Sequence, residues 1–436
     1  MSKWIKTTLA KIADIRVSNV DKKSYQGEKP VMLCNYMDVY SNDYITRDIS
    51  FMEATANIME VAKFTVSKGD VLITKDSETP FDIGIPAVVE EDIDNLICGY
   101  HLAQLRPDEN KVDSVFLAKK LAMPDVASYF SRVAAGSTRY GLSNGAIANT
   151  SINLPPLDVQ RKISDILKTI DNNIKKTEVL IDKYRRIKKG MMHDLFTRGL
   201  ETNGRLRPKR ELAPELYKET PLGWIPNDWI FSTCSNVCEK IIDCKNRTPP
   251  LLEEGYPVIR TPNVRNGEFV TEGLVYTDFQ SFISWTARGK PIPGDIVITR
   301  EAPVGEVCKI PSDYPDVCLG QRMMLYRTDK EKIDNDYFLY VLQSDFIQKR
   351  LDLISGGSTV GHVRVGDIKE LWIVYPMDKG EQRKIAASLN AITKKITSLQ
   401  LSLVKIKRKK NGIMSDLLTG KVSVQSKQEE IEAPHV

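Results

Sequence analysis

Apolar residues, with a few polar exceptions, recur at alternating steps of four and three along two stretches of the chain. The first series is Ile163, Leu167, Ile170, Ile174, Thr177, Ile181, Tyr184, Lys188, Met191 and Leu195. The second series is Ile385, Leu389, Ile392, Ile396, Leu399, Leu403, Ile406, Lys410, Ile413 and Leu417. This spacing places one apolar stripe along an α-helix, and neither series contains a proline. It predicts two long helices whose stripes pair in an antiparallel coiled coil.

Proline and glycine mark the ends of both predicted helices. Pro155-Pro156 and Pro376 precede them, and Gly199 and Gly420 follow them. Each series extends over about 50 Å at 1.5 Å per residue. We expect antiparallel pairing to hold the parts of the chain attached to the helices at a fixed separation.

The two helices belong to a larger internal repeat. Every member of the second series follows its counterpart in the first by the same offset, and other similarities recur in the same order at nearly that offset. The matching segments are "QRKI" at 160–163 and 382–385, "KGMMHDLFT" at 189–197 and "NGIMSDLLT" at 411–419, "AGST" at 135–138 and "GGST" at 356–359, and "KGDVLITK" at 68–75 and "PGDIVITR" at 293–300. Ordered matches of this kind predict two copies of one unit of about 220 residues.

Each copy begins with a globular part, called a head below, that combines short strands and helices. Apolar runs bounded by turn residues predict strands at 71–74 and 296–299, and one helical stretch is expected in each head, at 114–132 and 335–354. The predicted fold class is α+β, with a duplicated mixed α/β head followed each time by a long helix. The predicted segments are head 1 (1–155), helix 1 (156–199), a linker (200–221), head 2 (222–376), helix 2 (377–421) and a flexible tail (422–436).

Composition favours a globular cytoplasmic protein. Hydrophobic residues make up 42% of the 436 residues and charged residues 27%, and no apolar run approaches the length of a membrane span. The seven cysteines lack regular pairing intervals, which favours free thiols in a reducing compartment. Cys234, Cys238 and Cys244 cluster, but without a CxxC spacing or a nearby histidine, so no zinc site is predicted.

Positive charge is concentrated on the predicted helices. Residues 158–198 have a net charge of +5 and residues 380–421 a net charge of +8, whereas the whole chain has only +5. The runs at 183–189 and 405–410 are the densest. They are interpreted either as solvated helix faces or as surfaces near phosphates.

Motifs for nucleotide chemistry are missing from the sequence. "GGSTVGHV" at 356–363 lacks the Lys-Ser/Thr pair of a phosphate-binding loop. "NLPPL" at 153–157 lacks the aromatic residue and the spacing that an amino-methyltransferase turn requires. No nuclease-like group of carboxylates was identified either.

Several of these segments together resemble the DNA-specificity subunit of type I restriction–modification systems. The resemblance covers essentially the whole chain. It rests on two units in which "LPPLDVQRKISDIL" (154–167) or "YPMDKGEQRKIAASL" (375–389) leads into a long helix that ends in "KGMMHDLFT" or "NGIMSDLLT", and on "CNYMDVYSNDYI" (34–45), "GLSNG" (141–145) and "LGWIPNDW" (222–229).

The resemblance implies a non-catalytic protein that binds double-stranded DNA. Each head would be a target recognition domain that reads one half of a bipartite, asymmetric sequence, and the helices would set the spacing between the halves. The helices would also dock two methyltransferase (modification) subunits that hold S-adenosylmethionine, and restriction/translocase subunits that use ATP and Mg²⁺ would join them. This chain itself would bind no cofactor and no metal.

Candidate DNA-binding residues are polar residues in turns where the two copies differ, because the two heads should read different sequences. Arginine suits guanine, asparagine or glutamine suits adenine, and acidic residues suit cytosine. The candidates are Lys75, Asp76, Glu78, Arg139 and Tyr140 in the first head, and Arg260, Asn263, Arg300, Glu301, His362 and Arg364 in the second. The shared pairs Ser137-Thr138 and Ser358-Thr359 fit either phosphate contacts or an ordinary turn.

Two other classes of function are weighed against this one. A protein-interaction scaffold with two adaptor heads would keep the coiled coil but would not bind DNA in a sequence-dependent way. A methyltransferase or nuclease would need a cofactor pocket or metal-binding carboxylates, for which the sequence gives no motif. Sequence-dependent DNA binding by the chain with a modification subunit would separate these alternatives.

Overall fold

The computed structural model describes residues 4–356 and 361–424 and divides the chain into two compact units. The first unit is formed by residues 1–178 and 402–436, and the second by residues 179–401. Each unit therefore contains one head, half of one long helix and half of the other. Two predicted features, the pair Ser358-Thr359 and most of the tail (425–436), lie outside the described residues.

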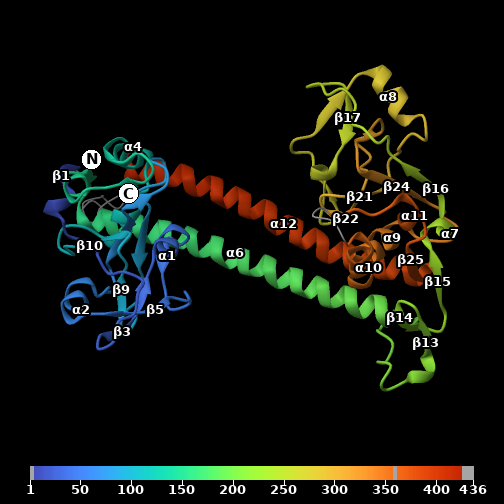
Figure 1. The fold of residues 1–436 in the computed structure, drawn as a ribbon, viewed down its shortest axis with the longest axis horizontal. Coiled ribbons are helices and arrows are strands. Elements are labelled where there is room, and N and C mark those ends of the chain that lie inside the picture. Colours follow the sequence, from blue (N-terminus) through green and yellow to red (C-terminus); the bar gives the residue numbers. More distant parts are fainter. Residues whose placement is uncertain (1–3, 357–360, 425–436) are drawn as a thin grey trace, which may run out of the picture. The chain divides into compact units, whose positions relative to one another are not determined.

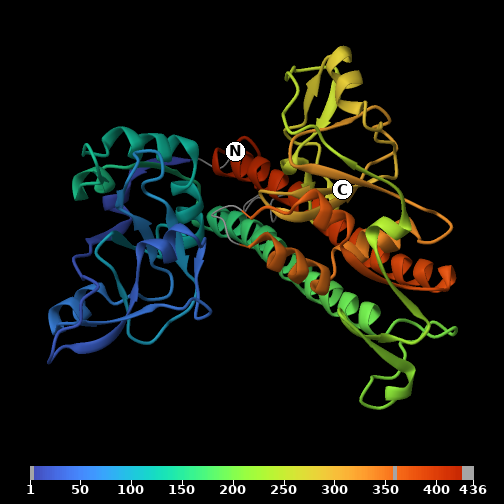
Figure 2. The same ribbon diagram turned by 45° about the vertical axis from the view of Figure 1, so that its right-hand side comes forward.

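The first head is built around two sheets (Figure 1). The larger has the strand order β2-β10-β6-β8-β4, from Ala13–Val17, Leu102–Pro107, Val71–Thr74, Pro86–Val89 and Tyr44–Ile45. The smaller has the order β5-β3-β9, from Met52–Ala56, Lys29–Cys34 and Leu96–Cys98. Two pairs complete the head, β1 (Ile5–Thr8) with β12 (Ser151–Leu154), and β7 (Asp76–Ser77) with β11 (Tyr140–Gly141). Figures 1 and 2 show β3 and β5 at the far end of this head from α4 (Pro124–Val133).

The second head repeats this arrangement of strands. Its four-stranded sheet has the order β16-β24-β21-β22, from Cys238–Asp243, Met323–Thr328, Ile296–Arg300 and Val304–Lys309. Its three-stranded sheet has the order β20-β17-β23, from Val275–Thr277, Tyr256–Ile259 and Cys318–Leu319. The pairs are β15 (Trp229–Thr233) with β25 (Trp372–Pro376), and β18 (Val264–Arg265) with β19 (Glu268–Phe269). Both three-stranded sheets combine one parallel and one antiparallel pairing, which confirms the predicted duplication.

The short helices of the first head are α1 (Tyr36–Tyr40), α2 (Ile58–Phe64), α3 (Ser114–Leu121), α4 and α5 (Asn144–Ala148). Those of the second head are α7 (Cys234–Val237), α8 (Phe279–Thr286), α9 (Asn335–Leu342), α10 (Asp345–Ser355) and α11 (Val365–Lys369). Three-residue 3-10 helices occur at Leu9–Lys11, Pro214–Leu216 and Thr261–Asn263.

The prediction of one helical stretch in each head was wrong, because each stretch is two helices. In the first head Met123 has an extended backbone, and Pro124 opens α4 as the first residue of a new helix. Proline has no N–H to continue the preceding helix, so it favours a new start. In the second head Ser344 has the same extended backbone between α9 and α10.

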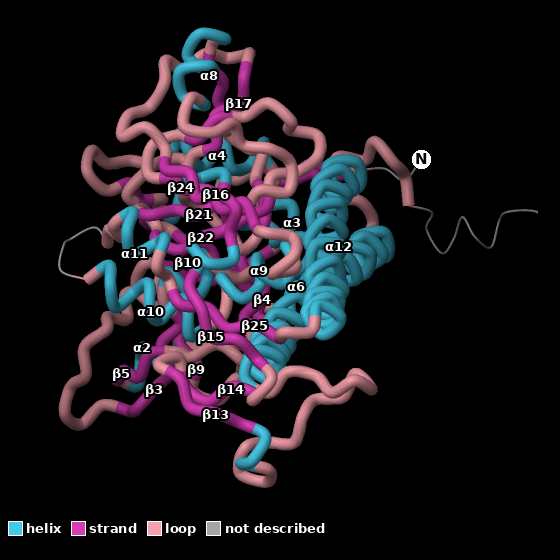
Figure 3. Tube along the Cα trace, turned by 90° about the vertical axis from the view of Figure 1, so that its right-hand side faces the viewer, coloured by secondary structure: helices cyan, strands magenta, loops and turns pink. Residues whose placement is uncertain are grey.

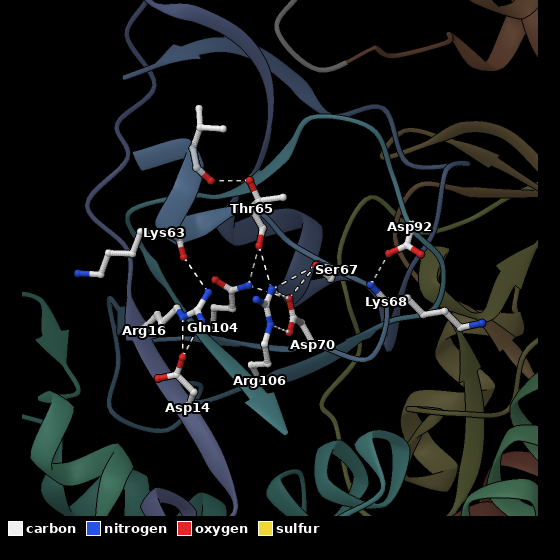
Figure 4. A network of polar contacts seen from close by, with 11 residues as sticks. Asp14, Arg16, Lys63, Thr65, Ser67, Lys68, Asp70, Asp92, Gln104 and Arg106 are labelled. Atoms are coloured by element: carbon white, nitrogen blue, oxygen red, sulfur yellow. Dashed lines mark hydrogen bonds and ion pairs between the residues drawn. The ribbon is translucent and has the colours of Figure 1, made fainter. Parts of the chain in front are cut away.

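In both heads a buried carboxylate is hydrogen-bonded to an arginine on a strand of the main sheet. Asp70 is 1% exposed and receives hydrogen bonds from the guanidinium of Arg106, at 2.8 Å to each carboxylate oxygen, and from Gln104 at 2.7 Å (Figure 4). Asp295 and Arg327 form the same two-pronged contact in the second head, at 2.9 and 2.7 Å. A buried charge needs such pairing, so this contact explains why "GD" recurs in both copies.

The two long helices are α6 (Leu157–Thr197) and α12 (Lys379–Leu418). Both are followed by the predicted glycines, Gly199 and Gly420, whose φ values of 64° and 74° lie in the left-handed region that ends helices. All of the stripe isoleucines and leucines predicted to form the seam, and Tyr184 with them, are at least half-buried. Fully buried are Ile163, Leu167, Ile181, Ile385, Leu389, Ile392 and Ile396, and half-buried are Ile170, Ile174, Tyr184, Leu403 and Ile406.

Within each unit the start of one long helix shares a core with the end of the other. In the first unit Ile163 and Leu167 of α6 belong to the same core cluster as Leu417 of α12. In the second unit Ile385 of α12 belongs to the same cluster as Leu195 of α6. The helix segments in each unit are therefore antiparallel, as their stripes predicted.

The predicted linker is more structured than expected. It contains the 3-10 helix Pro214–Leu216 and strand β13 (Tyr217–Thr220), which pairs with β14 (Gly223–Pro226). Arg207 anchors it, because its guanidinium contacts both carboxylate oxygens of buried Glu381 on α12, at 2.6 and 3.0 Å. Figures 1 and 3 place this hairpin at the opposite end of the second head from α8 and β17.

Among the residues that the structure describes, none of the helices is both long and apolar enough to span a bilayer.

Candidate nucleic-acid interface

In the first head, the structure brings together two segments that the sequence singled out. Strand β7 pairs with β11, so that Tyr140 lies opposite Ser77 and Gly141 opposite Asp76. The backbone N–H of Leu142 also donates to the carbonyl oxygen of Lys75 at 2.8 Å. Residues 74–80 and 137–144 are therefore neighbours in space, although they are far apart along the chain.

Asp76 is the centre of this pair of segments. Its carboxylate accepts a hydrogen bond from the Lys75 ammonium at 2.7 Å and lies 2.9 Å from Nδ1 of His101. Partial burial opposes its ionisation, but these two partners outweigh burial and lower the pKa of the Asp76 carboxyl. An ionised carboxylate is a hydrogen-bond acceptor, which is the chemistry that recognises the amino group of cytosine.

The other candidates of the first head lie on its surface. Glu78, Ser137, Thr138 and Arg139 are exposed, and Tyr140 is half-buried. The turn that presents them requires glycine, because a Cβ on Gly136 (φ 143°) would lie 1.8 Å from the carbonyl oxygen of Arg139. Phe81, which the sequence analysis did not single out, is 85% exposed in the adjoining loop.

The second head joins the equivalent segments in the same way. Glu301 and His362 form an isolated β-bridge, and the N–H of Val363 donates to the carbonyl oxygen of Arg300 at 3.1 Å. The Glu301 carboxylate lies 2.6 Å from Nδ1 of His362 and 2.9 Å from Nε of Arg322. Each head thus presents one acidic residue held between two potentially cationic side chains.

Arg300 differs from the other candidates because its side chain is only 8% exposed. Its nearest charged partner is Asp243, with 3.8 Å between Nη2 and Oδ1. Within the described part of the chain, neither Nε of Arg300 nor Oδ1 of Asp243 has a hydrogen-bond partner. Buried polar atoms of this kind are costly, and among the described residues Nε of Arg260 also lacks a partner.

The remaining candidates of the second head divide into buried and exposed residues. Asn263 is fully buried, where it accepts from the N–H of Arg260 at 3.0 Å and donates to the carbonyl oxygen of Val270 at 3.0 Å. The Arg260 guanidinium donates to the carbonyl oxygen of Gly273 at 2.9 Å. These contacts shape the loop before β18, whereas His362 and Arg364 are exposed.

His101 and Arg322 are functional candidates that the sequence analysis missed. The sequence does contain a signal that could have identified them. Arg322 follows His101 by the same number of residues as "GGST" follows "AGST", so the two residues occupy equivalent positions in the repeat. Each head therefore pairs an acidic residue with a basic residue at equivalent positions, Asp76 with His101 and Glu301 with Arg322. The second basic partner comes from a different position in each head, Lys75 in the first and His362 in the second.

Part of the basic helix surface is neutralised within the chain. In the first unit Lys410 lies 2.7 Å from Asp171 and 3.0 Å from Asp43, and Lys407 lies 2.7 Å from Glu178. Lys405, Arg408 and Lys409 of the same run are exposed, and Lys407 is exposed as well despite its ion pair. These exposed side chains are available for contact with another molecule.

The described residues show no grouping suited to a metal ion. In residues 4–356 and 361–424, no three His, Cys, Asp or Glu side chains come together as a potential metal site. The seven cysteines are free thiols, and six of them are buried.

Comparisons with known proteins agree on one family. The family model described as "Type I restriction modification DNA specificity domain" matches residues 1–183 and again 226–408. Among relatives from Methanocaldococcus jannaschii, a protein described as the MjaX type I restriction enzyme specificity subunit is 27% identical, with 84% of this chain and 81% of that protein covered. The MjaVIII specificity subunit is 24% identical, with 93% and 91% covered.

Solved structures share the fold at low sequence identity. The crystal structure of a type I restriction–modification S subunit from M. genitalium has a TM-score of 0.56 at 15% identity, with 95% of this chain and 96% of that chain covered. A chain from a study of assembly and conformational transition of the type I system has a TM-score of 0.53 at 18% identity, with 95% and 97% covered.

Proposed function

Because this chain belongs to the family of type I restriction–modification DNA-specificity proteins, we propose that it is the subunit that selects the DNA sequence in such a complex. Each head reads one half of a bipartite, asymmetric target in double-stranded DNA. The observation that carries this proposal is the acidic residue held between two basic side chains in each head, because the acid and one of its partners occupy equivalent positions but are different residues in the two heads. Two heads with one plan but different side chains suit two different half-sequences.

The proposal assigns no catalysis to this chain. Methylation and cleavage belong to partner subunits, namely methyltransferase subunits that hold S-adenosylmethionine and restriction subunits that use ATP and Mg²⁺. The long helices are the proposed docking surface for two methyltransferase subunits, and the cytoplasm is the proposed compartment. The exposed apolar side chains Ile166, Val179, Ile187, Leu401 and Val404 on these helices support a surface that another protein covers.

Selection from random duplexes tests this function. The chain is purified together with its modification subunit, bound duplexes are isolated by gel shift, and their sequences are determined. We expect enrichment of two short elements separated by a fixed gap. Binding without any sequence preference would instead support the scaffold function.

A head exchange separates the contribution of each half. Residues 1–155 are replaced with the first head of another family member, and adenine methylation is mapped by sequencing. We expect one half of the methylated sequence to change while the other half stays the same. A change in both halves would contradict independent reading by the heads.

A further inference from the structure

An open cavity of about 870 Å³ lies entirely within the second unit. It is bounded by the second half of α6, the first half of α12, the β18–β19 hairpin and the turn between α9 and α10. Five basic side chains line it against two acidic ones, Glu268 and Asp345. The basic residues are Arg185, Lys188, Lys189, Arg265 and Lys349. The volume is within the range of small-molecule sites, and the excess of positive charge favours an anion.

The internal repeat provides a matched comparison for Lys188. Lys410 holds the same place in the second copy of the helix, at the matching step of the second apolar series. In the first unit Lys410 is paired with Asp171 at 2.7 Å. The position of Asp171 is taken in the second unit by Thr393, which lines the cavity and has no charge. Lys188 therefore lacks the helix carboxylate that neutralises its counterpart.

A second ion pair is missing at the next turn of the helices. Lys407 and Glu178 are 2.7 Å apart in the first unit. Their counterparts in the second unit, Arg185 and Gln400, both line the cavity, and Gln400 cannot supply a negative charge. The carboxylates Asp171 and Glu178 of the first unit thus correspond to the neutral residues Thr393 and Gln400 of the second unit, and both of these line the cavity.

The residues around Lys188 compensate its positive charge only in part. Its ammonium lies 5.3 Å from the centre of the Tyr340 ring, and the Glu268 carboxylate accepts a hydrogen bond from Thr397 at 2.7 Å. Burial lowers the pKa of Lys188, with Glu268 opposing this effect. A bound anion would supply the charge that burial makes costly to leave uncompensated.

The cavity also has an apolar wall. Met192, Phe196, Phe346 and Ile396 line it together with the basic residues. Lysine and arginine bind phosphate oxygens strongly, and aromatic and aliphatic side chains suit a flat organic ring. Enclosure by four structural elements favours a small molecule over duplex DNA, whose phosphates are contacted along an extended surface.

We propose that this cavity binds a small phosphate-bearing molecule of nucleotide size, with its phosphates toward Lys188 and Arg185 and its ring toward the apolar wall. This site goes beyond the proposed reading of DNA by the heads and does not depend on it. The first unit, whose two lysines are paired within the chain, has no equivalent need for an anion.

Calorimetric titration of the full chain at low ionic strength tests the site with three probes. ADP carries phosphates and a ring, pyrophosphate carries only phosphates, and adenosine carries only the ring. We expect ADP to bind more tightly than pyrophosphate, and adenosine at least tenfold more weakly than ADP. Added salt should weaken ADP binding, because the contacts are ionic. Failure of both phosphate probes to bind would overturn the proposal.

Substitution of Thr393 provides the sharpest variant. Thr393→Asp gives the second unit the carboxylate that Asp171 supplies in the first, so it should pair with Lys188 and lower ADP affinity at least tenfold. Lys188→Met, which removes the charge and keeps the apolar stem, should lower it to a similar extent. Ser398→Asp is the matched control, since Ser398 is exposed on the same helix and does not line the cavity; it should change affinity less than twofold.

Thermal unfolding and DNA binding complete the test. Thr393→Asp should keep or raise the melting temperature, which separates loss of the ligand from loss of the fold, and should leave DNA selection by the heads unchanged. Unaltered ADP binding in Thr393→Asp, or an equal loss in Ser398→Asp, contradicts the proposed site. An effect of Thr393→Asp on duplex DNA alone, without any effect on ADP, would assign the cavity to a DNA phosphate and overturn the small-molecule proposal.

Discussion

The side-chain oxygen of Gln160 accepts a hydrogen bond from the backbone N–H of Asp113 at 3.0 Å. The same side chain donates to the carbonyl oxygen of Pro155 at 2.9 Å, so it connects the start of α6 to the residue that caps α3. Gln382 repeats both contacts in the second unit, with Asp334 at 2.6 Å and Pro376 at 2.8 Å. A glutamine side chain supplies a separate donor and acceptor at the end of one long side chain, which explains the glutamine of the duplicated "QRKI".

Replacement of Gln160 with methionine should destabilise the first unit. Methionine has a similar length but leaves the N–H of Asp113 and the carbonyl oxygen of Pro155 without their partner in a buried place. We expect the free energy of unfolding to fall by roughly 1–3 kcal/mol, as measured by urea denaturation of the full chain. The neighbouring Arg161 is exposed, so Arg161→Met should change the stability by less than about 0.5 kcal/mol. Equal losses in the two variants would show that the hydrogen bonds of Gln160 do not matter.

The stripe residues of the long helices provide the second prediction. Ile392 is 8% exposed, and Ile170 is half-buried. Replacing both with aspartate places carboxylates against apolar neighbours, so we expect lower thermal stability and loss of assembly with the modification subunit. Size-exclusion chromatography of the mixture measures the assembly.

The control for this pair changes charge on the outer faces of the same helices. Asn172 and Lys395 are exposed, and their double replacement with aspartate should preserve assembly. Normal assembly of the Ile170→Asp, Ile392→Asp variant would contradict antiparallel pairing of the stripes.

Some of these relationships follow from sequence patterns, and others do not. The alternating four-three spacing predicted both long helices and their inward faces, because a single periodicity determines them. The partners of Asp76 could not be predicted in the same way, since His101 comes from a different strand connection and approaches only when β6 and β10 pair. The break at Met123 and Ser344 also escaped prediction, because the apolar pattern continues across both turns.

Charge interactions buried between elements were the least accessible from sequence. The side chain of Lys119 on α3 is only 6% exposed, and its ammonium lies 2.7 Å from Asp43 and 2.8 Å from Asp171. Its place within a largely apolar helix gives no indication that two acidic residues from other segments surround it. Similarly, the lysine shared by both stripes was visible in the sequence, but its partners, which differ between Lys188 and Lys410, were not.

Lowering the pH should reduce the stability of the first unit, because the Asp43 carboxylate becomes protonated. Although burial opposes ionisation of this carboxyl, Lys119 and Lys410 outweigh it and lower its pKa from 3.8 to about 2. A group with a depressed folded-state pKa stabilises the protein above its unfolded pKa, and this contribution is lost as the pH falls through the folded value. The contribution of Asp43 should therefore be complete above pH 3.8 and decline toward pH 2.

Urea denaturation of the parent and Asp43→Asn across this range measures the effect. The parent should be more stable above pH 3.8, and the difference between the two should shrink as the pH approaches 2. Asp48→Asn is the control, because the Asp48 side chain is 86% exposed, and its difference from the parent should remain small throughout. A difference for Asp43→Asn that does not vary with pH would refute the role of its charge.

The last prediction concerns Glu301, which lies between His362 and Arg322 in the second head. A carboxylate only accepts hydrogen bonds, as the amino group of cytosine requires, whereas an amide both donates and accepts, as adenine requires. Glu301→Gln should therefore change the preferred base at one position of one half-sequence. Loss of a good base contact costs roughly 1–3 kcal/mol, which corresponds to about 5- to 150-fold weaker binding of the original sequence.

Mapping methylated adenines in cells that express the variant with its modification subunit measures this change. The companion variant Asp76→Asn should alter only the other half-sequence, because Asp76 holds the equivalent place in the first head. Glu254→Gln is the control, since Glu254 is an exposed acidic residue of the second head that does not belong to the segments containing Glu301 and His362, and it should leave the methylated sequence unchanged. Thermal unfolding establishes that each variant is folded. If folded Glu301→Gln methylates the same half-sequences as the parent, this residue takes no part in base recognition. If Glu301→Gln and Asp76→Asn alter the same half-sequence, the proposal that each head reads its own half is wrong.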